Sequence, residues 1–249
     1  MTLLSKVESR AGILTKLVAH RGDQETFVEN TLEAFQQASD AGALFVECDI
    51  QFTKDLIPIV FHDENLKRLY LMDFAISGLH GFDINALGTL YQIPKLSELL
   101  VWLEQHPKIT LFLEVKPDIL QRLSADEVAD LLFEIVVASL NNQLVIISES
   151  VQTLEACAAK FSCSMGWVAE GDDVPSRALE QHMDYIFMSA DDVANIPDWK
   201  QKGIKVGVYT INDAARAFDI LEMGADLIET NYFSRMLRDM EGGDAQNRL

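Results

Sequence analysis

Short apolar runs alternate with amphipathic stretches along most of the 249-residue chain. A short apolar run is typical of a buried strand, whereas apolar residues that recur every three or four positions are typical of a helix packed against a sheet. We interpret eight apolar runs as strands: 16–19, 44–52, 110–115, 144–148, 165–169, 185–188, 205–209 and 226–229. Helical patterns lie between them, for example at 30–41, 95–104, 126–140 and 213–223.

The regular alternation of strand and helix predicts an α/β protein with a parallel sheet. Eight such units in a chain of this length fit a closed (β/α)8 barrel, the TIM barrel, whose active site is expected at the C-terminal ends of the strands. An open, doubly wound sheet is the alternative. Because we find no linker, repeat or low-complexity segment, we expect a single domain over residues 1–249.

A ninth apolar run, residues 57–61, does not fit the eight units. It follows the run 44–52 after only four residues, TKDL, and a parallel crossover needs a dozen or more. We therefore predict a β-hairpin arm that folds back antiparallel after the second barrel strand. The arm would return His62 to the neighbourhood of Glu47 and Asp49.

Carboxylates occupy strand positions that a buried strand normally gives to Val, Ile or Leu. Glu47 and Asp49 are two residues apart, so both side chains point to the same face of the strand. Glu114 and Lys116 repeat this spacing on the next barrel strand. Three converging carboxylates suit a hard divalent cation such as Mg²⁺ or Ca²⁺ better than zinc. The alternative is that these acids only form ion pairs with Lys116 and Arg21.

Two histidines, His20 and His62, each follow an apolar run beside this predicted metal site. A pair of imidazoles can divide general acid and general base work near neutral pH. Arg21 offers a planar fork for phosphate oxygens and Lys116 a point charge. The remaining histidines lie in loop or helical surroundings and are interpreted as having no catalytic role: 80, 106 and 182.

The chain is acidic, with 39 acidic and 20 basic residues and a formal net charge of −19. Nucleic acids and anionic membranes need a basic surface, so neither is expected as a general partner, whereas a small phosphate ester is compatible with one local Arg and Lys. No stretch approaches the roughly 18–20 apolar residues of a transmembrane segment, and the N-terminus lacks a signal-peptide core. We expect a cytoplasmic protein with reduced cysteines, because the three cysteines form no CxxC pair. The sequence predicts no oligomeric state.

Several motifs in order resemble the glycerophosphodiester phosphodiesterase family. These are "AHRG" followed by "ENT", then "VECDIQFTKD", "IVFHDENL" and "LEVK", with the weaker "VIISES", "VYTIND" and "GADLIETN" towards the end. The resemblance implies a (β/α)8 barrel that hydrolyses glycerophosphodiesters to glycerol 3-phosphate and an alcohol with a divalent cation. Carried over by motif, it implies an acid/base pair of His20 and His62, metal ligands Glu47, Asp49 and Glu114, and phosphate contacts Arg21 and Lys116.

The chain also departs from the family pattern. Val28 stands where Pro is usual, Tyr209 where Trp is usual, Glu149 where Phe is common and Asn231 where Asp is common. A small insertion usually helps to recognise the glycerol, and the corresponding segment here, about 64–94, is atypical. None of these positions belongs to the implied catalytic set, so the departures concern the substrate more than the reaction.

Two other functions remain compatible with these residues. One is a phospholipase D-like lyase that acts on lysophospholipids and leaves a cyclic phosphate. The other is a catalytically silent, phosphate-binding barrel, although such a protein would have no chemical need for both histidines and all three acids. The alcohol group, the choice between Mg²⁺ and Ca²⁺, and the division of acid and base roles stay open.

Overall fold

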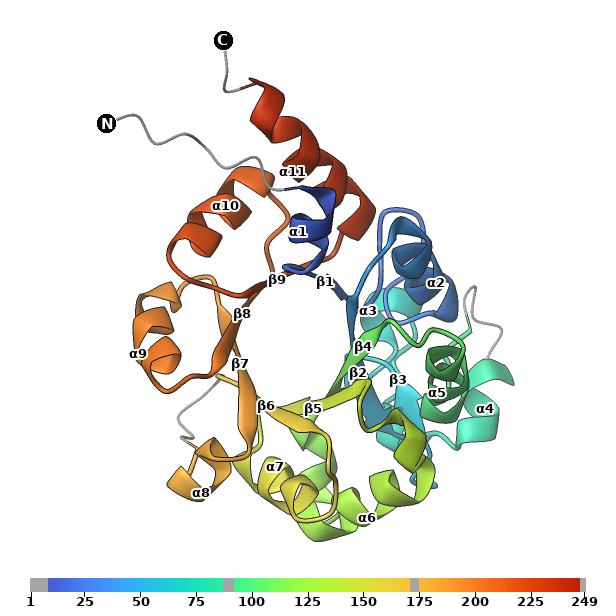
Figure 1. The fold of residues 1–249 in the computed structure, drawn as a ribbon. Helices are drawn as coiled ribbons and strands as arrows, with labels where there is room; N and C mark the ends of the chain where they lie inside the picture. The colour runs from blue at the N-terminus through green and yellow to red at the C-terminus, as the bar shows by residue number, and fades with distance from the viewer. Residues whose placement is uncertain (1–8, 87–91, 171–174, 247–249) are drawn as a thin grey trace.

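The computed structural model describes residues 9–86, 92–170 and 175–246. Eight parallel strands form a barrel, and helices surround it (Figure 1). The first strand pairs with both the second and the last, so the sheet is closed and the open-sheet alternative is wrong. The barrel strands are β1 (Leu17–His20), β2 (Phe45–Phe52), β4 (Thr110–Val115), β5 (Leu144–Ser148), β6 (Ser164–Val168), β7 (Met183–Ser189), β8 (Lys205–Tyr209) and β9 (Leu227–Thr230).

The barrel interior and the helix-facing layer form separate apolar clusters, because successive side chains of a strand point to opposite faces. Large side chains such as Phe112, Tyr185 and Phe187 fill the interior, with ring centroids of Phe112 and Phe187 4.9 Å apart. The outer faces of the strands pack against the helices in the larger cluster. This arrangement explains why most positions of the barrel strands are apolar on both faces.

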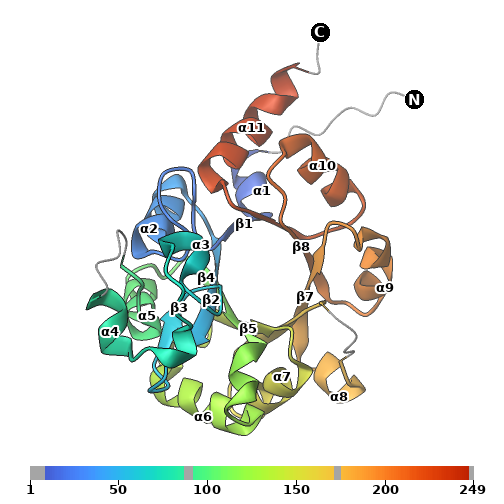
Figure 2. The same ribbon diagram turned by 180° about the vertical axis from the view of Figure 1, so that it is seen from behind.

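Helices cover the barrel all round, as the two views along its axis show (Figures 1 and 2). They are α1 (Arg10–Leu14), α2 (Leu32–Ala41), α5 (Leu96–Glu104), α6 (Ala125–Ile135), α7 (Val151–Ala158), α8 (Arg177–Glu180), α9 (Ile196–Gln201), α10 (Ala214–Glu222) and α11 (Phe233–Gln246). Short 3₁₀ helices are Pro117–Gln121, Ala138–Leu140 and Val193–Asn195.

The predicted helix 126–140 is wrong at its C-terminal end. α6 stops at Ile135, Val136 is extended (φ −77°, ψ 115°), and a separate 3₁₀ turn follows. Residues 135–137 are Ile-Val-Val, and three β-branched side chains in succession disfavour a helix because each loses χ1 freedom against the preceding turn. The apolar periodicity continued past the point where the local backbone preference changed.

The ninth apolar run forms the predicted hairpin. β3 (Pro58–Val60) is antiparallel to β2, with Val60 opposite Ile50, and the Phe61 amide donates to the Asp49 carbonyl at 3.0 Å. Leu56 takes the left-handed conformation in the turn (φ 62°), where glycine would be less strained. Pro58 is tolerated because β3 is an edge strand outside the barrel.

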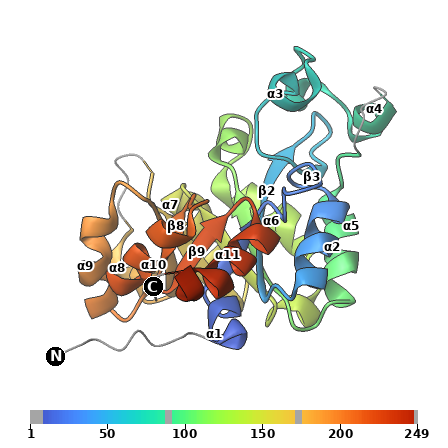
Figure 3. The same ribbon diagram turned by 90° about the horizontal axis from the view of Figure 1, so that it is seen from above.

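The segment after the hairpin forms a small lobe with its own apolar core. It contains α3 (Lys67–Tyr70), a 3₁₀ turn (Ile76–Gly78) and α4 (Gly81–Ala86). The lobe projects from one end of the barrel, whereas α1 lies at the other (Figure 3). Part of the predicted insertion 64–94, residues 87–91, lies outside the described residues. The core residues are Ile59, Phe61, Leu66, Ile76, Ile84 and Ile93.

Two further properties of the structure concern its cysteines and the length of its helices. Cys48, Cys157 and Cys163 are buried free thiols, and burial raises the pKa of each above its ordinary value. Among the described residues, no helix combines the length and apolar character that a membrane crossing requires.

Candidate active site at the C-terminal ends of the strands

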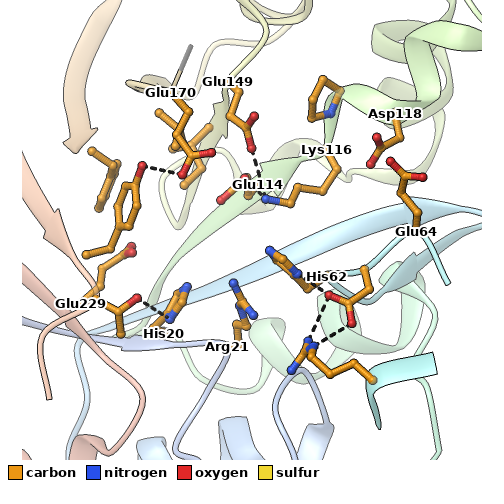
Figure 4. A pocket seen from close by; sticks show the side chains of 18 of the residues that line it. His20, Arg21, His62, Glu64, Glu114, Lys116, Asp118, Glu149, Glu170 and Glu229 are labelled. Carbon is orange, nitrogen blue, oxygen red and sulfur yellow. Dashed lines mark hydrogen bonds and ion pairs between the residues drawn. The ribbon is translucent and has the colours of Figure 1, made fainter. Parts of the chain in front are cut away.

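A cavity of about 660 Å³ opens where the barrel strands end, beside the hairpin lobe. Five of the seven predicted site residues line it: His20, Arg21, His62, Glu114 and Lys116. Figure 4 shows their side chains directed into the same space. The other two, Glu47 and Asp49, are 1% and 0% exposed and contact this lining from within the barrel. The structure therefore brings all seven predicted residues together.

The three predicted metal ligands form one cluster. One carboxylate oxygen each from Glu47, Asp49 and Glu114 lies within 4.8 Å of the other two. Asp49 and Glu114 are paired residues of neighbouring strands, which explains their proximity. Glu47 Oε1 and Asp49 Oδ1 are buried and have no hydrogen-bond partner among the described residues. Because buried acceptors are costly when unpaired, these oxygens fit a hard cation such as Mg²⁺ or Ca²⁺.

The ion pairs with Arg21 and Lys116 that the sequence offered as an alternative are present. The Arg21 amide donates to Glu47 Oε2 at 3.0 Å, and Arg21 Nε lies 3.0 Å from Asp49 Oδ2. Lys116 Nζ donates to Glu114 Oε1 at 2.6 Å and lies 3.5 Å from Asp49 Oδ1. These contacts leave Glu47 Oε1 without a hydrogen-bond partner in the described ranges, so they satisfy the cluster only in part.

The sequence analysis missed Asn30 as a site residue. Asn30 Nδ2 donates to Asp49 Oδ2 at 2.9 Å, and the Asp49 amide donates to Asn30 Oδ1 at 3.4 Å. Asn30 is 2% exposed and has φ 59°, a left-handed conformation that Asn tolerates better than most residues. The signal was the "ENT" motif, to which no contact had been assigned.

The sequence analysis also missed Glu229, a fourth buried carboxylate. It lies on β9, lines the cavity and is 3% exposed, and within the part of the chain that the structure describes its Oε1 has no hydrogen-bond partner. An acid at a strand position that a buried strand normally gives to an apolar residue was the signal used for Glu47, and it applied here as well. Glu149 and Glu170 also line the cavity, where they accept hydrogen bonds from Lys116 Nζ at 3.3 Å and Tyr209 Oη at 2.8 Å.

The four buried carboxyl groups do not ionise alike. Burial, followed by the charge of neighbouring carboxylates, raises the pKa of Glu114 to about 7 and of Glu229 to about 8, and raises the pKa of Glu47 well above its ordinary range. Burial would also raise the pKa of Asp49, but Arg21 and Lys116 together lower it below its ordinary value. Asp49 is therefore the acid that is most firmly ionised without a bound cation.

We expect the metal-free protein to lose stability as the pH rises from 6.5 to 9. In the folded state Glu114 and Glu229 keep protons up to pKa values of about 7 and 8, whereas their unfolded values are near 4.5. Stability from a raised pKa is present at low pH and is lost as the pH rises through the folded pKa. His20, with its pKa lowered from 6.5 to about 4, opposes this trend only below pH 6.5.

The melting temperature of the EDTA-treated protein, measured at several pH values, reports this loss of stability. Each kcal/mol lost from the free energy of unfolding lowers the melting temperature by about 2–4 °C in a domain of this size. Glu229→Gln should flatten the decline, because the amide has no proton to lose. Glu222→Gln changes an exposed acid at the end of α10 and should leave the decline of stability with pH unchanged. A melting temperature that is constant or rises over this pH range contradicts the expectation.

The two histidines have different partners. His20 Nδ1 lies 2.8 Å from Asn231 Oδ1, and burial, followed by the charge of Arg21, lowers the pKa of His20 to about 4. His62 Nδ1 lies 2.7 Å from Asp63 Oδ1. Phe61 is held against Asp49 in the hairpin, and His62 follows it directly, which places the second imidazole at the cavity as predicted.

Arg68 links the hairpin lobe to the loop that follows the first barrel strand. It donates from Nε to Asp63 Oδ2 at 2.7 Å and from Nη1 to Glu29 Oε2 at 2.8 Å. Glu29 in turn accepts from Arg21 Nη1 at 3.0 Å. A chain of hydrogen-bonded side chains therefore runs from His62 through Asp63, Arg68 and Glu29 to Arg21, and it holds α3, whose sequence "KRLY" belongs to the atypical segment, against the cavity.

The closed barrel and the polar cavity at its C-terminal end are those of a TIM-barrel enzyme. A profile of the glycerophosphoryl diester phosphodiesterase family matches residues 20–234. The chain therefore belongs to this family, as its motifs suggested.

Individual relatives agree with this assignment. A glycerophosphodiester phosphodiesterase of Bacillus subtilis is 24% identical over 248 residues, which cover 86% of this chain and 83% of that protein. A glycerophosphodiester phosphodiesterase of Bacillus altitudinis is 35% identical over 117 residues, or 43% of this chain and 47% of that protein. Among solved structures, a phosphodiesterase of Oleispira antarctica in complex with the product sn-glycerol-3-phosphate has a TM-score of 0.77 at 24% identity, covering 94% of this chain and 100% of that one. At this identity the likeness supports the fold.

Proposed function

We propose that this protein is a metal-dependent phosphodiesterase that hydrolyses glycerophosphodiesters to glycerol 3-phosphate and an alcohol. The observation that carries the proposal is the convergence of two histidines, two cationic side chains and a three-carboxylate cluster on one cavity. Family membership supports the substrate class, as does the product bound in the Oleispira relative.

The cationic residues of the cavity would hold the phosphate group. Arg21 and Lys116 both line the cavity and can donate to phosphate oxygens. Burial by itself would lower the pKa of both groups. Asp49 and Glu47 outweigh it for Arg21, and Glu114 and Asp49 outweigh it for Lys116, so both pKa values are raised and both side chains stay charged at neutral pH. A divalent cation held by Glu47, Asp49 and Glu114 would supply further neutralisation of phosphate charge.

The two imidazoles would move the protons. One histidine takes a proton from the nucleophile, which is water or the neighbouring glycerol hydroxyl, and the other gives a proton to the leaving alkoxide. His20 and His62 belong to β1 and to the end of the hairpin arm, so they approach the cavity from different elements. This placement allows one imidazole to act on each of the two oxygens that change bonding at phosphorus.

The products of a substrate panel test this proposal. Glycerophosphodiesters with choline, ethanolamine, glycerol and inositol head groups, together with a lysophospholipid, should be incubated with Mg²⁺ or Ca²⁺ and followed by phosphorus NMR. We expect glycerol 3-phosphate and the free alcohol from at least one glycerophosphodiester. A cyclic phosphate that accumulates, with the lysophospholipid preferred, would establish the lyase instead. No turnover of any substrate would favour the silent phosphate-binding barrel.

A further inference from the structure

We infer that Asn231 and Gln24 are positioning residues that fix the tautomer of His20, with the proton on Nδ1 and the lone pair of Nε2 facing the cavity. The inference deepens the proposed function and rests on it for the catalytic consequence. Gln24 lies in the loop after β1 and Asn231 in the loop after β9, and both form hydrogen bonds with His20. Neither residue belongs to the set that the sequence motifs assigned to catalysis.

Hydrogen-bond accounting fixes the direction of each contact. Gln24 Nε2 lies 3.0 Å from the backbone oxygen of His20, which can only accept, so Gln24 presents its NH₂ group here. The same Nε2 lies 3.2 Å from the side-chain atom of Asn231 that faces His20. That atom must therefore accept, which identifies it as Oδ1 rather than Nδ2. Because Oδ1 can only accept, His20 Nδ1, at 2.8 Å, must donate and carries the proton.

The opposite ring nitrogen faces the site. His20 Nε2 lies 3.8 Å from Glu47 Oε2, which is longer than a hydrogen bond, and that oxygen already accepts from the Arg21 amide at 3.0 Å. His20 lines the cavity. With Nδ1 protonated, the Nε2 lone pair is directed to a molecule in the cavity and can accept a proton from it.

The backbone holds the two amide side chains in place. The backbone N–H of Gln24 donates to the backbone carbonyl of Asn231 at 2.8 Å, and the backbone N–H of Asn231 donates to Asn212 Oδ1 at 2.9 Å. Thr210 Oγ1, 3.4 Å from His20 Nδ1, is a hydroxyl that can accept as well as donate, so it does not oppose the assignment. The loops after β1, β8 and β9 are thus tied together around the imidazole.

The second histidine has no such amide partner among the contacts described. His62 Nδ1 faces the Asp63 carboxylate, which Arg68 holds through two hydrogen bonds of 2.7 and 3.2 Å. A carboxylate stabilises an imidazolium, whereas a neutral amide oxygen only orients a neutral imidazole. The two environments therefore divide the work: His20 accepts the proton of the nucleophile and His62 donates to the leaving group.

Nitrogen NMR of the ¹⁵N-histidine-labelled protein tests the tautomer directly. Long-range proton–nitrogen correlations at pH 8, in metal-free protein, show which ring nitrogen is protonated, and the His20→Ala spectrum assigns the His20 signals. We expect wild-type His20 to carry its proton on Nδ1. Asn231→Leu should shift the proton to Nε2, whereas Asn231→Asp should keep it on Nδ1, because a carboxylate oxygen can still accept.

Kinetics should follow the tautomer. Asn231→Leu is expected to lower kcat about 10–100-fold with KM nearly unchanged, by analogy with the loss on removing the hydrogen-bond partner that orients a metal-binding histidine. Asn231→Asp should retain most of kcat. Gln24→Met removes the donor that orients Asn231 and should produce a smaller decrease in kcat together with a mixture of tautomers.

A wild-type His20 protonated on Nε2 overturns the inference, and so does an Asn231→Leu variant that loses activity while His20 keeps its Nδ1 proton. If Asn231→Leu does not fold, the wild-type and Gln24→Met spectra decide the matter. If the protein turned over no phosphodiester while the tautomer responded as expected, the proposed function would fail and the structural assignment of the tautomer would stand.

Discussion

Removal of divalent cations with EDTA is expected to abolish turnover of glycerophosphodiesters, and added Mg²⁺ or Ca²⁺ is expected to restore it. Glu114 and Glu229 line the cavity, Glu47 and Asp49 lie buried directly beside its lining, and Arg21 and Lys116 contribute positive charge close to all four carboxyl groups. Those two cations already contact Asp49. Without a further cation, Arg21 and Lys116 would have to neutralise both the ionised Asp49 and the anionic phosphodiester, which is unfavourable in a poorly solvated cavity.

Initial rates with chelated and reconstituted protein measure the effect, and calorimetry with Mg²⁺ or Ca²⁺ alone measures cation binding independently of activity. Glu114→Gln removes one charged ligand and should weaken cation binding, whereas Glu222→Gln, an exposed acid on α10, is the matched control. Full activity of the chelated protein would remove the cation from the proposal and leave Glu47 and Glu114 as buried partners of Arg21 and Lys116.

The fold could be predicted because its signals are local. Each barrel strand is an apolar run buried on both faces, and four residues between Phe52 and Ile57 are too few for anything but a return hairpin. The end of α6 could not be placed by periodicity alone. There the apolar spacing favoured a continued helix, and the β-branched residues 135–137 favoured extended backbone.

The residues of the candidate site could be predicted where a charged side chain stands at a strand position that is otherwise apolar. Glu47, Asp49 and Glu114 are acids at positions that otherwise hold apolar residues, so each indicated a metal ligand without knowledge of the tertiary structure. Glu229 gave the same local signal, but whether it faces the cavity or the helices depends on how β9 pairs with β1 and β8.

Partners that come from distant loops left no such signal. Asn231 is 211 residues from His20, and Glu29 is 39 residues from Arg68, so their contacts exist only once the barrel is closed. The sequence therefore identified two histidines as a pair without distinguishing them. Their separate environments, a neutral amide for one and a paired carboxylate for the other, arise from tertiary structure.

Replacement of either histidine by alanine is expected to lower kcat by about 10²–10⁴-fold, the usual range for loss of a general acid or base. His20 and His62 line the same cavity and are each fixed at Nδ1 by one partner, Asn231 Oδ1 at 2.8 Å or Asp63 Oδ1 at 2.7 Å. In both cases this leaves Nε2 as the ring nitrogen for proton transfer. Steady-state kinetics with saturating cation measure kcat, and circular dichroism and the melting temperature confirm that each variant folds.

His182→Ala is the matched control. His182 is exposed in the turn directly before β7, at the end of the strand away from the cavity, so the kcat of this variant should equal that of the wild type. A substrate whose leaving alcohol is a good leaving group, such as a nitrophenol, separates the two roles. Departure of a nitrophenolate needs no proton, so the loss should shrink for the histidine that protonates the leaving group and persist for the base. In the division of roles inferred above, that histidine is His62. If either alanine variant kept near wild-type kcat with the glycerophosphodiester, its imidazole would have only the structural role that its bond to Asn231 or Asp63 already provides.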